Sequence, residues 1–331
     1  MFKYVLKRLG LSLLILFGVS LIIYFLVRLM PSDYIDNKFQ SQLSQGTITK
    51  EDIQRMKDLY GIGDSSFLGI LSGYWNWVVK LFHGDLGQSF LYKEDVAKVI
   101  SDNMGISFIL AFISFVLEMI IAIPIGIHAA THQYGAFDYI SSVLVIIGIS
   151  LPSFFLAALL MKIFAMDLGW FPLQGLVDAT ADYSNWWEEF VDKLHHLILP
   201  MTVLTLTSIG GLTRHSRTNM LEVLNSDYIR TARAKGLSEK KVIYKHAFRN
   251  TLIPIVTMLA GALPGLFGGA MITETVFAIP GIGQKAYSAL TQGDIPFIMG
   301  YNMFLATLTV IGTLLSDIAY SLVDPRVKIT K

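Results

Sequence analysis

Few side chains in this sequence are arranged in a way that could do chemistry. The 331 residues include no cysteine, which excludes thiol catalysis, disulfides and cysteine-ligated metals. No G-x-x-x-x-G-K-[ST] phosphate loop occurs, because Lys285 follows Gly281 and Gly283 at the wrong spacing. We therefore expect no catalytic residues and no bound cofactor. If ATP supplies energy to this protein, another chain must bind that ATP.

His128 and His132 are spaced four residues apart, so on a helix they would share one face and could bind a metal. No glutamate occupies the H-E-x-x-H position, which excludes a zincin, and no third ligand lies nearby in the sequence. We expect no metal site.

Three acidic residues, Glu118, Glu274 and Asp317, lie within apolar stretches. Ionisable side chains are costly inside a membrane and are functional candidates there. Glu118 lies deepest, and it either meets a ligand or forms a hydrogen-bonded contact between helices. Glu274 and Asp317 lie nearer to the ends of their stretches, where pairing within the structure is the better interpretation.

The segment 227–254 is basic and carries signals for two short helices. The first is predicted to run to Lys235 and to end at Gly236, a good C′ residue. Ser238 can cap a second helix that begins near Glu239. Two short helices joined at a glycine would form a compact, rigid projection suited to docking into a groove of another protein. The alternative is a solvated basic loop, or one that contacts anionic lipid headgroups.

The elements that carry these residues are predicted to be membrane-spanning helices. Only 15% of the residues are charged, and the mean hydropathy is +0.55, whereas soluble domains average about 25% charged residues. The net charge of +1 gives no reason to expect a nucleic-acid partner. A crossing needs about 20 mostly apolar residues. Six stretches qualify: Leu9–Val27, Ile106–Ile127, Tyr139–Met161, Leu197–Leu212, Thr251–Phe277 and Ile295–Val323.

The first stretch could instead be a cleaved signal peptide, but its apolar run is longer than usual and no A-x-A site follows. We therefore expect it to be retained. Small residues suit the fifth stretch to close helix packing, and three prolines are candidates for kinks. These residues are Gly261, Gly265, Gly268, Gly269, Pro124, Pro152 and Pro264.

The distribution of Lys and Arg predicts the orientation. The N-terminus, the loop 214–250 and the C-terminal tail are basic, whereas the segment between the third and fourth stretches is acidic. With six crossings the three basic segments fall on one side, so we expect both termini and this loop to be cytoplasmic. The predicted organisation is an N-terminal helix (1–30), an extracytoplasmic segment (31–96), a transmembrane domain (97–323) and a cytoplasmic tail (324–331).

Four motifs, in the same order along the chain, resemble those of one protein family. Ala232-Arg-Ala-Lys-Gly-Leu237 is similar to the EAA-type loop of type I ABC importer permeases, in the version found in dipeptide and oligopeptide permeases. The stretches Gly84–Ser89, Glu274–Gly283 and Asp324–Val327 resemble the same subfamily. Arg230 and Thr231 depart from the leading Glu-Ala of the general pattern.

The resemblance implies an all-helical, six-helix permease of the bacterial inner membrane, a first-permease (B-type) subunit of an ATP-driven importer. The chain would form half of the path for di- or oligopeptides and would itself hydrolyse nothing. Its partners would be a second homologous permease, two cytoplasmic ATPases, an external solute-binding protein, the peptide substrate and membrane lipid. Nickel or another small solute is the alternative substrate, and an ion-coupled secondary transporter is the alternative class.

As ionisable residues within apolar stretches, Glu118 and Glu274 are the candidates for the translocation path. For Glu274 the resemblance implies only a recurring motif position, but it does assign a coupling role to other residues. The residues that couple to the ATPase would be Arg230, Ala232, Arg233, Ala234, Lys235, Gly236, Leu237, Ser238 and Glu239.

Overall fold

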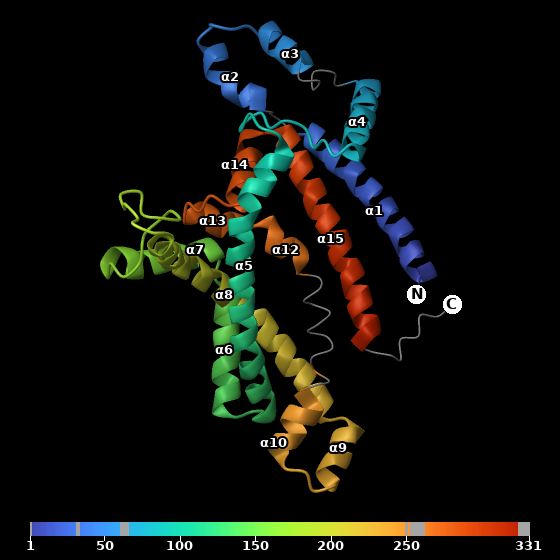
Figure 1. Ribbon diagram of the computed structural model, residues 1–331, viewed down its shortest axis with the longest axis vertical. Helices are drawn as coiled ribbons and strands as arrows, with labels where there is room; N and C mark the ends of the chain where they lie inside the picture. Colours follow the sequence, from blue (N-terminus) through green and yellow to red (C-terminus); the bar gives the residue numbers. More distant parts are fainter. Residues whose placement is uncertain (1, 31–33, 60–65, 249–250, 252–261, 324–331) are drawn as a thin grey trace.

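The computed structural model describes residues 2–30, 34–59, 66–248, 251 and 262–323, and these residues form helices almost throughout. In these ranges the only β-type pairing is an isolated bridge between Gln88 and Asp95. Figure 1 shows an elongated bundle, with one group of short helices at one end and α9 and α10 at the other. The predicted all-helical class is confirmed.

Helices α5 (Val96–Thr131) and α8 (Trp186–Leu224) form the centre of the bundle and pack along each other. A Cβ on Gly126 would lie 2.6 Å from Ser216 Cβ, so the two backbones approach closely there. Ser216 Oγ donates to the Ile123 carbonyl across the same crossing, at 3.3 Å. The predicted stretch Leu197–Leu212 proves too short, because α8 continues at both ends into polar sequence.

The predicted third span, Tyr139–Met161, is not one continuous helix. It comprises α6 (Ala136–Ser150), α7 (Ser153–Leu160) and the start of a π-helix, η1 (Met161–Asp167). The α6 and α7–η1 axes differ by 100°. Pro152 has no N–H to continue α6 and fixes the extended conformation at the break. The kink expected at Pro152 is therefore present, and it is much sharper than a bend within a helix.

The predicted fifth span, Thr251–Phe277, lies partly outside the described residues. From residue 262 onward it is not a continuous helix, because α12 (Leu263–Gly268) and α13 (Met271–Val276) are separated at Gly269. Gly269 has a φ of +79°, and a Cβ there would lie 2.5 Å from the Gly283 nitrogen. Close backbone contact with α14 (Ile282–Gln292) therefore replaces the helix. Pro264 lies in the first turn of α12 and kinks nothing in the described part of the chain.

Helix α1 (Phe2–Arg28) packs beside α15 (Ile295–Val323). Toward one end, Arg8 Nη2 lies 2.6 Å from Asp317 Oδ2, so the structural pairing expected for Asp317 is confirmed. The segment that follows α1 forms α2 (Tyr34–Ser44), α3 (Lys50–Leu59) and α4 (Phe67–Phe82), and α4 packs against the opposite end of α1.

Four of the described helices are long and apolar enough to cross a membrane, and the bent α6–η1 unit would make a fifth crossing. The four are Arg8–Arg28, Val96–Thr131, Trp186–Leu224 and Ile295–Asp317.

Candidate functional site

The basic hairpin, residues 227–248, lies beyond the ends of α5 and α8 (Figure 1). It consists of α9 (Asp227–Ala234), α10 (Glu239–Lys241) and a π-helix, η2 (Val242–Ala247). The two predicted helices and the break between them are confirmed. The physical reasons for the break lie in the backbone around Gly236.

Gly236 has a φ of +72°, a conformation that glycine adopts without strain. Its N–H donates to the Arg233 carbonyl at 2.9 Å, and the Leu237 N–H donates to the Ala232 carbonyl at 3.4 Å. These are the two bonds of a Schellman ending, and they satisfy carbonyl groups that the end of a helix leaves free. Ser238 occupies the predicted N-cap position, but its carbonyl rather than its side chain accepts the first bonds, from Lys241 and Val242.

An ion pair bridges the Gly236 turn. Arg233 Nη2 donates to Glu239 Oε1 at 2.6 Å, and Arg233 Nε donates to Oε2 at 3.2 Å. The hydrogen bond lowers the pKa of Glu239 and raises the pKa of Arg233. Both side chains are about half exposed, so solvent screens the pair, and it contributes at most about 1 kcal/mol. Its main effect is to hold α9 and α10 in one relative orientation.

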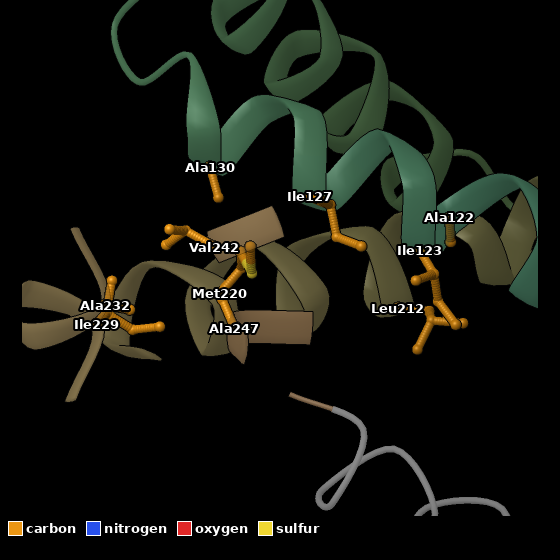
Figure 2. Packing of buried hydrophobic residues seen from close by; sticks show 10 residues of the cluster. All are labelled: Ala122, Ile123, Ile127, Ala130, Leu212, Met220, Ile229, Ala232, Val242 and Ala247. Atoms are coloured by element: carbon orange, nitrogen blue, oxygen red, sulfur yellow. The ribbon is translucent and has the colours of Figure 1, made fainter. Parts of the chain in front are cut away.

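The inner face of the hairpin is built into the bundle (Figure 2). Ile229 of α9 and Val242 and Ala247 of η2 have no exposed surface, and they pack in one cluster with Met220 of α8 and Ile127 of α5. Burial of each such side chain contributes about 1 to 3 kcal/mol. A force applied to the hairpin is therefore transmitted to α5 and α8 rather than absorbed by a loose loop.

Most of the nine predicted coupling residues lie on the outer face. Ala232 is buried and Leu237 is half-buried, so these two position the hairpin rather than contact a partner. Tyr228 and Tyr244, which the sequence reasoning missed, expose 47% and 59% of their surface on the same hairpin. Aromatic residues within a basic loop were the available signal. The exposed predicted residues are Arg230, Arg233, Ala234, Lys235, Gly236, Ser238 and Glu239.

Glu274 is fully buried at the junction of α13 and α14. Its carboxylate accepts the Ala270 N–H at 2.8 Å and the Gln284 N–H at 3.0 Å, so it caps the first turns of both helices. Ser107 Oγ on α5 accepts the Ile282 N–H at 2.9 Å. A Cβ on Gly281 would meet the Glu274 carboxylate, which explains this glycine of the motif. The observed contacts of Glu274 are structural, and its role in a path stays a prediction.

Asp294 was missed by the sequence reasoning and organises the Gly84–Ser89 motif. This fully buried carboxylate accepts Ser89 Oγ at 2.5 Å, the Leu91 N–H at 2.9 Å and the Phe90 N–H at 3.2 Å. It also accepts the Phe297 N–H at 3.2 Å in the first turn of α15. The motif is therefore tied to the start of α15 by a single carboxylate.

Glu118 is half-buried in α5 and makes no side-chain hydrogen bond to the part of the chain that the structure describes. Its role in a path also stays a prediction. The rings of His128 and His132 lie against each other with centroids 4.2 Å apart and planes tilted by 34°. Among the described residues, no three His, Asp or Glu side chains group in a way that could hold a metal ion.

The sequence of the chain matches one family model and several permease proteins. The family model for the binding-protein-dependent transport system inner membrane component matches residues 122–329. The oligopeptide transport system permease protein AppB of Bacillus subtilis is 33% identical over 329 residues, which cover 99% of this chain and all of that protein. The dipeptide transport system permease protein DppB of Alkalihalophilus pseudofirmus is 33% identical, with the same coverage.

A similar fold occurs in a solved structure of the MetNI methionine ABC transporter in an inward-facing conformation. The TM-score is 0.51, the sequence identity is 17%, and the match covers 69% of this chain and 97% of that one.

Proposed function

The chain belongs to the family of binding-protein-dependent transport system inner membrane components, and on that premise we propose that it forms half of the membrane path of a peptide importer. As such a component it is a multi-pass permease of an ABC importer in the inner membrane. Importers of this kind work with ATPase subunits, permease subunits and a substrate-binding protein, and the ATPases hydrolyse the ATP.

The basic hairpin is the site where the chain docks onto a cytoplasmic ATPase. The observation that carries this proposal is the contrast between its two faces. The outer face exposes Arg230, Lys235 and two tyrosines, while the inner face is packed against α5 and α8. A rigid handle of this kind converts closure of an ATPase pair into movement of the helices, a rigid-body form of two-state switching.

The substrate is a di- or oligopeptide. Relatives named as oligopeptide and dipeptide permeases match along the whole chain at 33% identity, which supports this assignment. In this importer the chain is the first permease, paired with a second, homologous permease, two ATPases and an external solute-binding protein. The family description, which names a binding-protein-dependent transport system, supports the external binding protein.

The topology is six crossings with both termini cytoplasmic. Four spanning helices and the bent α6–η1 unit supply five of these crossings. The sixth is the apolar stretch Thr251–Phe277 predicted from the sequence, which lies partly outside the described residues. The first turns of α1 and the last turns of α15 lie toward the same end of the bundle as the hairpin, which supports a common side (Figure 1). The organisation into 1–30, 31–96, 97–323 and 324–331 follows from this topology.

Single cysteines test the docking site without background, because the chain has none of its own. In the assembled transporter, Tyr244→Cys should react with a membrane-impermeant maleimide from the cytoplasmic side and form cross-links to the ATPase. Trp186→Cys, which replaces a side chain 73% exposed near the acidic loop, is the control that should react from the outside. Reaction of Tyr244→Cys from the outside would overturn both the topology and the docking role.

Transport in vesicles tests the substrate and the energy source. Uptake of a labelled dipeptide should require ATP and the binding protein, and an ion gradient alone should give none. Uptake of Ni²⁺ but not of peptide would show that the substrate is nickel and not a peptide. Uptake driven by the gradient would contradict the proposed function.

A further inference from the structure

Helix α4 lies in the segment predicted to be external, yet it is apolar on two of its three faces. One face packs into the bundle, where Tyr74, Trp77 and Val78 are buried against α1 and the start of α15. A second, polar face carries Asn76 and Lys80 and, with the C-cap residue His83, lines a cavity of about 1700 Å³. The third face exposes six large apolar side chains, each between 41% and 84% exposed: Phe67, Leu68, Leu71, Trp75, Val79 and Phe82. Val79, at its edge, also borders the cavity.

The contacts of α4 with α1 fix its depth. Tyr74 Oη lies 2.9 Å from Ser20 Oγ, and the Tyr74 ring meets Phe17 edge to face with the centroids 6.2 Å apart. Ser20 lies eight residues from Arg28, the end of the apolar run of α1, which corresponds to about 12 Å along the helix. The middle of α4 therefore lies beside the last turns of the apolar run of α1, between Ser20 and Arg28, and the Arg28 guanidinium comes close to Gly73.

We infer that α4 is an interfacial membrane helix whose third face lies against phospholipid acyl chains. The observation that selects lipid is the neighbouring helix α1, which over the same turns exposes Leu21, Ile22 and Leu26 in a chain that belongs to the inner membrane. With 16 residues, α4 is about 24 Å long, too short for a hydrocarbon core of about 30 Å. The leaflet, which is the outer one, follows from the proposed topology.

The three faces of α4 suit this position. A helix at the interface needs an apolar side toward the acyl chains and a polar side toward water. Asn76 and Lys80 supply the polar side, and they point to the cavity that α1, α2 and residues 83–97 surround. The buried face then ties the helix to α1, so lipid contact helps to fix the segment that follows the first crossing.

Nitroxide labels on single cysteines test the inference in the full transporter reconstituted in phospholipid nanodiscs. Leu71→Cys, Trp75→Cys and Phe82→Cys should collide with oxygen several-fold more often than with a water-soluble nickel chelate. Asn76→Cys, on the polar face, should show the reverse order. Ile22→Cys on α1, which replaces a side chain 57% exposed, is the matched lipid-facing control.

Two results would overturn the inference. Collision with the nickel chelate at all α4 positions would place the helix in water. Low collision with both reagents at Leu71, Trp75 and Phe82 would show that protein, not lipid, covers this face. If the collision rates fell only when the binding protein was added, the binding protein would be the covering partner. Both readings are independent of the ATPase cross-links, so the proposed function could stand while this inference fails.

Discussion

Arg233 and Glu239 face each other across the Gly236 turn, and their pairing sets the orientation of α9 against α10. Reversing the charge with Arg233→Glu places two carboxylates where the 2.6 Å contact now lies. We expect a loss of about 1 kcal/mol, or roughly fivefold weaker ATPase association, because the pair is half exposed. Pull-down of the ATPase with detergent-solubilised permease measures the effect.

The exchange of both residues, Arg233→Glu with Glu239→Arg, separates orientation from direct recognition. It restores the ion pair and should recover most of the association if the pair acts by positioning the hairpin. Full ATPase association by the single reversal would count against the docking role.

Asp294 is a second residue on which a whole segment depends. Asp294→Ala leaves four donors without this acceptor: the buried Ser89 hydroxyl and Phe297 N–H, and the partly buried N–H groups of Phe90 and Leu91. The expected cost is about 3 kcal/mol or more, since each unsatisfied buried donor costs about 1–3 kcal/mol. Thermal unfolding in detergent measures the loss, and exposed Asp182→Ala should leave the transition unchanged. Equal midpoints of thermal unfolding for the two variants would show that the Asp294 carboxylate does not stabilise the contact between residues 89–91 and α15.

The sequence contained a signal for Asp294 that was not used. An aspartate two residues before a proline, at the start of an apolar run, is a typical N-cap. Its bonds to Ser89, Phe90 and Leu91 join residues about two hundred positions apart, and no local pattern predicts those. The two capping bonds of Glu274 differ in the same way, since Ala270 is near in sequence and Gln284 is reached only through the fold.

At the level of elements, the crossing of α5 and α8 depends on Gly126. Gly126→Ala would place a methyl group 2.6 Å from Ser216 Cβ and 2.8 Å from the Thr213 carbonyl oxygen, both on the facing helix. We expect a loss of about 1–3 kcal/mol, typical of overpacking. The loss should appear as a lower midpoint of thermal unfolding in the purified permease.

Gly211→Ala is the matched control within α8. Nothing lies within 4 Å of a Cβ added there, so alanine should be neutral or stabilise the helix by up to about 1 kcal/mol. A tolerated Gly126→Ala, with Gly211→Ala equally tolerated, would contradict the close crossing.

Helix α9 and its end at Gly236 could be predicted because their signals are local: small residues, a C′ glycine and a following serine. A kink at Pro152 was expected, but its angle of 100° could not be predicted, because the direction of the second helix depends on packing. The break at Gly269 could not be predicted either, because it depends on contact with Gly283. Hydropathy also underestimated α8. It marks the part of a helix that lipid covers, and α8 continues well beyond Leu197–Leu212 at both ends.

At the scale of the whole molecule, the ion pair of Arg8 and Asp317 ties the N-terminal helix to the last one. Asp317→Ala leaves the Arg8 guanidinium without this carboxylate in a mostly apolar setting. We expect a cost of about 1–3 kcal/mol, because a partly buried charge loses one charged partner. A lower unfolding midpoint of the purified permease should report it.

The charge-exchanged variant, Arg8→Asp with Asp317→Arg, is the control and should regain most of the loss. An unchanged midpoint for Asp317→Ala would show that apolar packing alone holds α1 in place.

The continuity of α8 has a mechanical consequence. One helix of 39 residues runs from the capping Asn185 to Leu224, directly before the hairpin, a length of about 58 Å. Pro200 lies inside α8 and interrupts its hydrogen bonding, so the helix is not a uniform rod. For a straight rod of the same length, a tilt of one degree about one end would displace the other end by about 1 Å. A small rotation of α8 at one membrane surface thus moves its other end by ångströms. The size of this movement depends on where along the helix the rotation axis lies.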